Sequence, residues 1–600
     1  MSPERDMYIL GISCFYHESA AALIKDGVLI AAAQEERFSR IKHDYSFPIQ
    51  AIQFCLRQAG INAADLDYVV FYEKPLVKFE RILLTTLGTF PRSWRTFGEA
   101  MINWFDGKLW IKSLLMRKLG LPENKVLFTD HHMAHAASAL FCSPFEETAI
   151  MTVDGVGEWT TATLGYGHAS WEDGSANEII LTHEQRFPHS LGLLYSAFTA
   201  FLGFKVNNGE YKVMGMAPYG KPRFVDKIYD HLIKTQDDGS FWLNMDYFSY
   251  HYSPDRSFNG KFIKLFGEPR VPDSYFITTL TDPDEADPDD SHVQQNQYYA
   301  DVAASIQQVT EETLLKMANS LQRQTGLKRL CMAGGVALNS VANGRILRET
   351  LFEEIYIQPA AGDAGGALGA ALYVYHVLLH QPRRFVLEHA YWGQEYGDQE
   401  IKTTLERVGA RYEYISDDEL LLGQVVNGLV NGKVIGFYQG RFEWGPRALG
   451  NRSILADPRR ADMKDIVNKK IKFREPYRPF APVILEERAS DFFEGLEEPE
   501  RHYPARYMLL VLPWKDGAGN LIPAVNHLGT GRLQTIRREW NPRYYRVIER
   551  FGEATGVPVL MNTSFNLRGE PIVSSPVDAW NTFSKSKIDV LVLGQYWVEK

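Results

Sequence analysis

The sequence predicts an α/β protein built as two lobes. At 600 residues the chain exceeds one ordinary domain, and about three to five structural units are expected. Short apolar runs typical of strands alternate with longer segments of helical periodicity. Glycine-rich turns follow several of these runs, as is common in α/β folds. Polar sequence at 381–398 predicts a linker between a first domain, 1–380, and a second, 399–600.

The first lobe begins with a predicted strand, 8–13, and a hairpin. Apolar segments at 19–25 and 28–33 flank Asp26-Gly27, a dipeptide that suits a tight hairpin turn. Further strands are expected at 67–72, 125–129, 148–153, 329–332 and 354–358, and helices at 48–58, from 131 onward and at 294–323. Residues 82–118 are aromatic and basic, and they predict an amphipathic helical insertion packed on the body. A role at a membrane surface is the less favoured alternative for this insertion.

Composition and charge exclude several classes of protein. The chain has 64 Lys and Arg against 74 Asp and Glu, a net charge of −10, which argues against a nucleic-acid partner. Its longest apolar candidate, 190–204, is too short to span a membrane and predicts a buried helix. The N-terminus lacks the pattern of a signal peptide, and no Cys-x-x-Cys pair occurs. We therefore expect a protein of the reducing cytoplasm.

A group of histidines and aspartates predicts a metal site. His131 and His135 are four residues apart, so a helix would place both imidazoles on one face. Asp154 ends an apolar strand before a glycine-containing turn, and Asp363 lies in a similar glycine-rich segment. Two imidazoles and two carboxylates suit a divalent transition metal, iron(II) or zinc ahead of calcium. Taken singly, Asp154 would be explained as a turn former and Asp363 as a helix cap.

Two glycine clusters each follow a strand and open a helix. These are Gly334-Gly335 and the group Gly362, Gly365 and Gly366. Backbone N–H groups at such places favour phosphate, although neither cluster has the spacing of a known nucleotide fingerprint. Close packing of helix against strand explains the glycines equally well.

The second lobe is rich in cations that lie beside Gly, Pro and aromatic residues. The run comprises Arg441, Arg447, Arg452, Arg459, Arg460, Lys469, Lys470, Lys472, Arg474 and Arg478, followed later by Arg532, Arg537 and Arg538. A solvated basic face is the usual explanation of such a run. Here the placement of the arginines beside Gly, Pro and aromatic residues favours bidentate binding of phosphate and carboxylate groups. In an acidic protein this indicates a small anionic substrate such as a nucleotide or an acyl phosphate.

Together these segments resemble the carbamoyltransferases of the NodU/CmcH family. The resemblance covers nearly the whole chain and rests on long matching runs: Gly11–Ser13 with His17 and Ser19, Gln34–Phe38 with Lys42-His43, His131–His135, Val153–Gly155, Gly209–Gly215, Gly334–Asn339, Gly362–Gly365, Phe442–Gly450, Arg474–Phe480 and Asn562–Asn566.

The resemblance implies a first lobe of the actin-like ATPase (ASKHA) fold and a second lobe similar to YrdC-like enzymes. It further implies that carbamoyl phosphate and ATP react in the second lobe to give carbamoyl-adenylate. The first lobe would then transfer the carbamoyl group to a hydroxyl of a small-molecule acceptor, a secondary metabolite such as an antibiotic or toxin. Homodimers are common for this fold class, but no feature of the sequence proves one.

Carried over residue by residue, the resemblance assigns roles to the candidate residues. His131, His135, Asp154 and Asp363 would bind the metal, with iron(II) as the family's ion. His17, as general base, and Lys42 would serve the acceptor side. Carbamoyl phosphate and Mg-ATP would be held by Arg447, Lys472, Arg478, Arg532 and Ser564, the first three of them catalytic. Gly334, Gly335 and Asn339 would bind the nucleotide or adenylate in the first lobe.

One segment departs from the family pattern. His527–Arg532 is one residue shorter than expected and lacks an aspartate, which makes the assignment of Arg532 less direct and indicates a remodelled loop. Two other functions stay open: a tRNA threonylcarbamoyl-transfer type of enzyme, and a non-catalytic actin-like nucleotide-binding scaffold. The acidic balance and the fused second lobe weigh against the first, and the intact histidine, aspartate and arginine sets weigh against the second.

Overall fold

The computed structural model describes residues 6–106 and 108–600 and contains two compact units. The first unit comprises the chain up to His17, Ala21–Ile30 and Ala59–Val386, and the second comprises Glu18–Ala20, Ala31–Gln58 and Leu387–Lys600. The main boundary falls within 381–398, the predicted linker. The assignment of Ala31–Gln58 to the second unit was not anticipated from the sequence.

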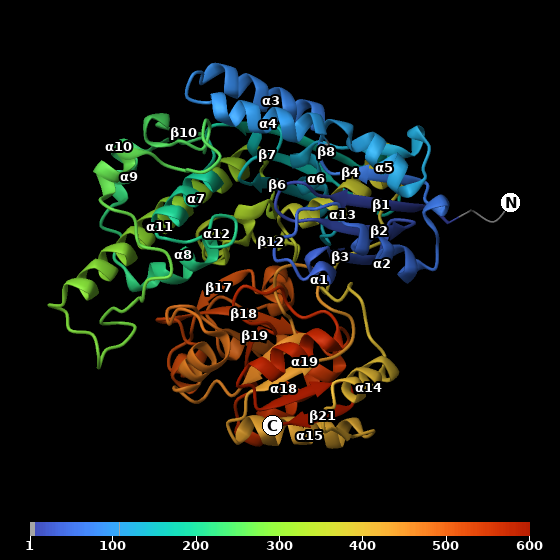
Figure 1. Ribbon diagram of the computed structural model, residues 1–600, viewed down its shortest axis with the longest axis vertical. Coiled ribbons are helices and arrows are strands. Elements are labelled where there is room, and N and C mark those ends of the chain that lie inside the picture. Colours follow the sequence, from blue (N-terminus) through green and yellow to red (C-terminus); the bar gives the residue numbers. More distant parts are fainter. Residues whose placement is uncertain (1–5, 107) are drawn as a thin grey trace. The chain divides into compact units, whose positions relative to one another are not determined.

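The first sheet is built from five strands in the order β3-β2-β1-β4-β5 (Figure 1). Its members are β1 (Tyr8–Ser13), β2 (Ala20–Lys25), β3 (Val28–Gln34), β4 (Tyr68–Phe71) and β5 (Val126–Phe128). Strand β4 pairs in parallel with β1, and β5 pairs in parallel with β4. Between β2 and β3, Asp26 has a φ of 48° and Gly27 a φ of 80°, which are the left-handed values that a type I′ turn requires.

A second sheet repeats this order later in the chain. It is β12-β11-β6-β7-β8, made of β6 (Glu147–Val153), β7 (Thr160–His168), β8 (Glu178–Arg186), β11 (Arg329–Ala333) and β12 (Glu354–Ile357). In each sheet, three consecutive strands lie side by side, and two later strands are added in parallel beside the first of them. This duplication is the arrangement of the actin-like α/β fold, and the predicted fold class is confirmed.

Helices α6 (His131–Leu140) and α13 (Asp363–Tyr373) pack closely because glycine lies at their contact. A Cβ atom added at Gly369 would lie 1.8 Å from the Ala134 carbonyl oxygen. One added at Gly11 of β1 would lie 1.8 Å from the Ala367 carbonyl oxygen. The glycines therefore allow α13 to approach both α6 and the first sheet, which fixes the elements that carry the histidine and aspartate group. The predicted buried helix is α7 (Leu191–Phe201).

Gly369→Ala is expected to lower the free energy of unfolding by about 1–3 kcal/mol, because the new methyl group would push two helices apart. Urea denaturation measures this change. Gly98→Ala is the matched control: Gly98 is also helical, and among the described residues no atom lies within 4 Å of its added Cβ. This control is expected to be neutral or to stabilise by up to about 1 kcal/mol. Equal stability of the two variants would contradict the packing argument.

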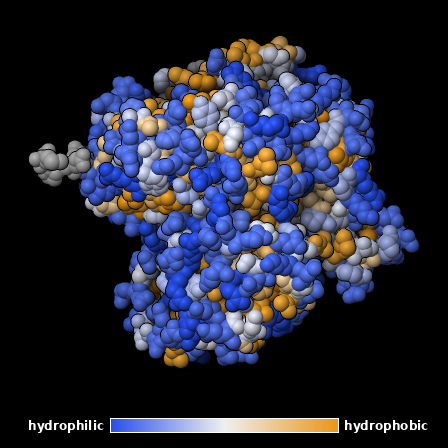
Figure 2. Space-filling view, turned by 180° about the vertical axis from the view of Figure 1, so that it is seen from behind, coloured by the Kyte–Doolittle hydropathy of each residue, from blue (hydrophilic) through white to orange (hydrophobic). Residues whose placement is uncertain are grey.

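The predicted insertion consists of α3 (Pro75–Gly88), α4 (Trp94–Asp106) and α5 (Ile111–Leu119). Phe79 and Trp104 pack together with their ring centres 5.6 Å apart, and the Thr96 hydroxyl donates to the Tyr252 carbonyl. None of the helices within the described residues combines the length and hydropathy that a membrane crossing requires. Most of the face drawn in Figure 2 is hydrophilic, with hydrophobic residues in separate small patches.

The second unit contains a nine-stranded mixed sheet in the order β13-β21-β20-β14-β15-β19-β16-β18-β17. Its strands are β13 (Glu413–Tyr414), β14 (Ile435–Tyr438), β15 (Arg452–Ala456), β16 (Ala481–Leu485), β17 (Leu510–Pro513), β18 (Thr530–Ile536), β19 (Val559–Ser564), β20 (Val590–Leu593) and β21 (Tyr596–Glu599). Helices of this unit include α15 (Asp418–Val430), α18 (Pro542–Thr555) and α19 (Pro576–Lys585). A second α/β core is thus confirmed, and its likeness to YrdC-like enzymes stays a prediction.

Candidate functional site

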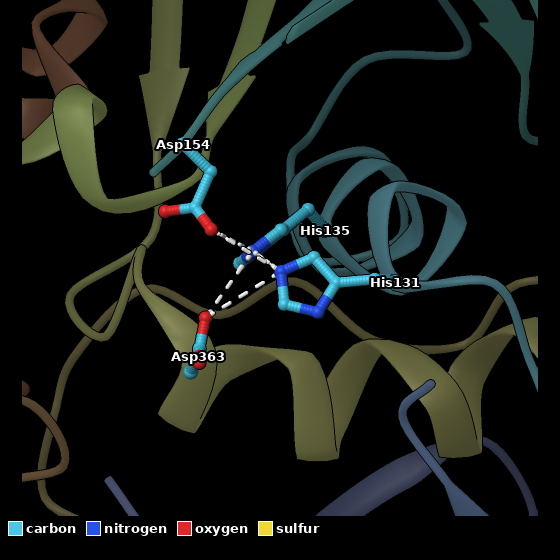
Figure 3. Close-up of side chains that lie close together, drawn as sticks. All are labelled: His131, His135, Asp154 and Asp363. Atoms are coloured by element: carbon cyan, nitrogen blue, oxygen red, sulfur yellow. Dashed lines mark hydrogen bonds and ion pairs between the residues drawn. The ribbon is translucent and has the colours of Figure 1, made fainter. Parts of the chain in front are cut away.

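Two helices and one strand end bring four metal-ligand side chains together in the first unit (Figure 3). His131 and His135 lie one turn apart on α6, Asp154 follows β6, and Asp363 begins α13. The His131 and His135 Nε2 atoms are 3.0 Å apart. One ligand atom from each of the four residues lies within 4.8 Å of the others.

The carboxylates face both imidazoles and are buried with them. Asp154 Oδ2 lies 3.3 Å from His131 Nε2. Asp363 Oδ1 lies 3.5 Å from His131 Nε2 and 3.7 Å from His135 Nε2. Asp363 Oδ1 is buried and accepts no hydrogen bond from the described residues. Such an orphaned oxygen, beside two imidazole nitrogens, fits a divalent transition metal bound by two nitrogen and two oxygen ligands.

Electrostatic coupling within the four residues also favours a bound cation. Burial alone would lower the pKa of His131, but the Asp154 and Asp363 carboxylates raise it well above the ordinary value. Burial would raise the pKa of Asp363, but His131 and His135 lower it to about 2. The carboxylates thus stabilise positive charge at the imidazoles, and a divalent cation would supply the same charge.

Neighbouring groups hold the ligands in place. The Gly335 N–H donates to Asp154 Oδ1 over 2.8 Å, which leaves Oδ2 to face the imidazoles. Both Glu158 carboxylate oxygens accept from the His131 N–H at 3.1 Å. Glu73 Oε2 lies 3.8 Å from His131 Nδ1, on the ring side away from the other ligands. A carboxylate in this position orients a ligating imidazole and fixes its tautomer.

His17 lies beside the same group, and of the predicted nucleotide residues Gly335 contacts it through its backbone N–H. His17 Nε2 is 3.9 Å from Asp363 Oδ2. Gly334 has a φ of 95°, and its Cβ would meet the Val153 carbonyl oxygen at 2.3 Å, so only glycine fits there. The Asn339 side chain caps α12 (Ser340–Glu349) by accepting from the Ala342 N–H.

Cations gather around Lys472 in the second unit. The Lys472 ammonium is 4% exposed and donates to the Ser564 carbonyl at 2.6 Å and to Asn566 Oδ1 at 2.6 Å. Burial lowers the pKa of Lys472 well below the ordinary lysine value. Three neighbouring cations act in the same direction: Arg474, Arg478 and Lys42. A bound phosphate would relieve this repulsion, so the cluster suits anion binding.

The other predicted residues of the second unit lie on separate elements. Arg447 is in the loop between β14 and β15, and Arg532 is on β18 opposite Val511 of β17. Ser564 ends β19, and its hydroxyl donates to Asn566 Oδ1 over 2.8 Å. Lys42 belongs to the second unit rather than to the unit that contains His17, which the sequence did not indicate.

Inorganic phosphate is expected to bind more weakly as the pH rises through the range below the ordinary lysine pKa, by up to about tenfold per pH unit. Lys472 has a lowered pKa, so it is charged below that value and loses its proton at a pH at which an ordinary lysine stays charged. Isothermal titration across this range measures the change. Lys472→Arg should flatten the profile, and an equally steep profile in that variant would assign the titration to another group.

Several supporting residues were absent from the sequence prediction. Glu73 and Glu158 hold His131, and Asn566 receives the Lys472 ammonium. Glu73 follows β4, a parallel strand, and its position at a strand end was the one signal that could have indicated it.

Comparisons with known proteins find related sequences over most of the chain. A family model described as carbamoyltransferase N-terminus matches residues 8–372, and one described as carbamoyltransferase C-terminus matches residues 426–600. The chain is 47% identical over 627 residues to an uncharacterized protein of Synechocystis sp., covering 99% of this chain and 97% of that protein. It is 37% identical over 597 residues to nodulation protein NolNO of Sinorhizobium fredii, and the match covers 98% of this chain and 79% of that protein. It is 34% identical over 275 residues to 3'-hydroxymethylcephem-O-carbamoyltransferase of Amycolatopsis lactamdurans, and the match covers 45% of this chain and 49% of that protein.

Proposed function

The chain belongs to the carbamoyltransferase family, and we propose that it uses ATP and carbamoyl phosphate to carbamoylate a hydroxyl of a small-molecule acceptor. The observation that supports this two-step reaction is the presence of two distinct sites in one chain. A buried metal-ligand group lies in the first unit, and a buried cationic cluster lies in the second. One relative is named 3'-hydroxymethylcephem-O-carbamoyltransferase, and we extend a small-molecule acceptor, a secondary metabolite, to this protein.

The second unit is proposed to form carbamoyl-adenylate. Lys472 and Arg478 would hold the phosphates of carbamoyl phosphate and ATP, with Arg447, Arg532 and Ser564 completing the site. Lys472 is already fixed by its hydrogen bonds to Ser564 and Asn566, so its charge is positioned before substrate binds. Preorganised cations of this kind stabilise the charge that develops on leaving phosphate groups.

The first unit is proposed to transfer the carbamoyl group. His131, His135, Asp154 and Asp363 would bind a divalent transition metal, with iron(II) as our first assignment. When bound, the ion would supply a positive charge to the phosphate of the adenylate. His17 would accept the proton of the acceptor hydroxyl at Nε2, and Asp363 Oδ2, 3.9 Å away, would stabilise the protonated imidazole. Gly334, Gly335 and Asn339 would line the adenylate site.

His17→Ala is expected to lower the rate of carbamoyl transfer by about 10²- to 10⁴-fold, because the acceptor proton would lose its base. AMP affinity and metal content should stay unchanged, since His17 lies outside the four proposed ligands. Single-turnover transfer from preformed carbamoyl-adenylate measures the step. His43→Ala is a comparison from the next histidine along the chain, which lies in the second unit. An unimpaired transfer rate for His17→Ala would remove His17 from the proposed mechanism.

The overall function is tested by incubating the protein with carbamoyl phosphate, ATP and a library of hydroxylated compounds. Mass spectrometry should detect a product heavier by about 43 Da together with AMP, the signature of group transfer through an adenylate. The same test with tRNA should give no product. A cytoplasmic location, a homodimer and the exclusion of nucleic-acid partners stay predictions of the sequence.

A further inference from the structure

Helix α3 carries a buried arginine, Arg81, that forms no ion pair within the described residues. Lys74, Lys78 and Arg81 are spaced by four and three residues and share one face of the helix. Lys74 pairs with Asp130 at 2.8 Å, and Lys78 pairs with Glu73 at 2.6 Å. Arg81 is only 7% exposed, yet within residues 6–106 and 108–600 it forms no ion pair and its buried Nη1 has no hydrogen-bond acceptor.

The nearby acids are already committed to other groups. Glu73 receives the Lys78 ammonium, and Glu158 accepts the backbone N–H groups of Lys74 and His131. The Phe187 ring, with its centre 5.0 Å from the guanidinium carbon, offsets part of the Arg81 charge. A cation–π contact gives the buried Nη1 no acceptor, and a buried donor without an acceptor is costly. A buried donor without an acceptor is rare, and an anionic ligand that binds there is one physical explanation.

Tyr16 packs against Lys78 of α3 and against His17. The Lys78 ammonium lies 4.7 Å from the Tyr16 ring centre, and the ring of His17 is 5.0 Å from that of Tyr16. Burial and the Asp154 carboxylate raise the pKa of Tyr16, while Arg81 opposes the rise. Lys78, one turn before Arg81 on α3, pairs with Glu73, and Glu73 Oε2 lies 3.8 Å from His131 Nδ1, which places Arg81 near the metal-ligand group.

We propose that Arg81 binds an anionic group, a carboxylate or a phosphate, of a substrate held beside the metal-ligand group. This proposal rests on the proposed function, because the substrate would be either the acceptor or the activated donor. A guanidinium offers two parallel N–H donors to such a group. The half-buried Lys108 adds positive charge near Lys78, whose own charge is paired with Glu73.

The first experiment measures anion binding on the full chain with inorganic phosphate as the probe. Arg81→Met is compared with Arg95→Met, the matched control on α4, where the arginine is exposed. Equilibrium dialysis should find one phosphate fewer per chain, or an affinity lower by about 10- to 100-fold, in Arg81→Met but not in the control. Arg81→Lys should retain part of the affinity.

Thermal unfolding separates this role from a purely structural one. Without added anion, Arg81→Met should unfold at the same temperature as the native protein or higher, because an unpaired buried charge has been removed. Phosphate should then raise the melting temperature of the native protein more than that of the variant. A variant that unfolds at a lower temperature and still binds all the phosphate would show that Arg81 only supports the fold.

Two further measurements, AMP binding and kcat/KM for anionic and neutral acceptors, identify the source of the anion. If it is the donor phosphate, Arg81→Met weakens AMP binding and slows transfer to every acceptor equally. If it belongs to the acceptor, AMP binding is unchanged, and only acceptors with a carboxylate or phosphate lose kcat/KM relative to their neutral analogues. Unchanged phosphate binding by Arg81→Met would overturn the proposal. So would weaker phosphate binding accompanied neither by weaker AMP binding nor by a lower kcat/KM for anionic acceptors. Failure of the native protein to carbamoylate anything would defeat the proposed function while leaving the phosphate result intact.

Discussion

The His131→Ala protein is expected to bind divalent metal more weakly by more than about 100-fold and to lose carbamoyl transfer. Changing a group that only orients a ligand costs about 10- to 100-fold in metal affinity, and His131 would be a ligand itself. Its Nε2 atom lies within 3.5 Å of Asp154 Oδ2, Asp363 Oδ1 and His135 Nε2, so its removal opens the centre of the group. Metal analysis of the purified protein and titration with iron(II) or zinc measure the loss.

Two comparisons make the metal prediction specific. His183→Ala removes an exposed histidine on β8 and should leave the metal content unchanged. Asp154→Asn removes a ligand charge with little change in shape, because Oδ1 can still accept from the Gly335 N–H. It should lose metal as His131→Ala does while keeping its near-ultraviolet circular dichroism. Full metal content in both ligand variants would exclude this group as the metal site.

The grouping of the four proposed metal ligands could be predicted in part, because local spacing determines how some of them are placed. Two histidines four residues apart share a helix face, and an aspartate at the end of a strand points out of the sheet edge. The groups that support them come from distant parts of the chain. Glu73 lies beside His131, which comes 58 residues later in the chain. Arg81 is distinguished only by the missing acceptor of its buried Nη1 atom. A missing partner is a property of the folded structure and leaves no trace in local sequence.

The elements of the fold that local sequence encodes could also be predicted, whereas the contacts between segments far apart in the sequence could not. The Asp26-Gly27 turn and the alternation of strands and helices are encoded locally. Membership of Ala31–Gln58 in the second unit depends on contacts between segments far apart in the sequence. The Arg37 guanidinium, for example, donates to the Gly445 carbonyl over 2.6 Å and across 408 positions. Periodicity carries no information on such pairings.

Lys472→Ala is expected to lower ATP-dependent AMP release by about 10²- to 10³-fold, the size of effect found when one preorganised charge-stabilising donor is removed. The ammonium is buried and is held by Ser564 and Asn566, so its charge is fixed in place before substrate binds. Lys469→Ala, which removes an ammonium paired with Asp465 on the exposed side of the same segment, should release AMP at the native rate.

The decisive measurement supplies preformed carbamoyl-adenylate to the Lys472→Ala protein. If the second unit only makes the adenylate, transfer to the acceptor should return to the native rate, because the residues proposed for transfer belong to the first unit. His131→Ala should show the opposite pattern, with AMP affinity of the second unit retained and transfer lost even when adenylate is supplied. A Lys472→Ala protein that adenylate does not rescue would mean that this lysine serves the transfer step as well, and the division of the two half-reactions between the units would then be wrong.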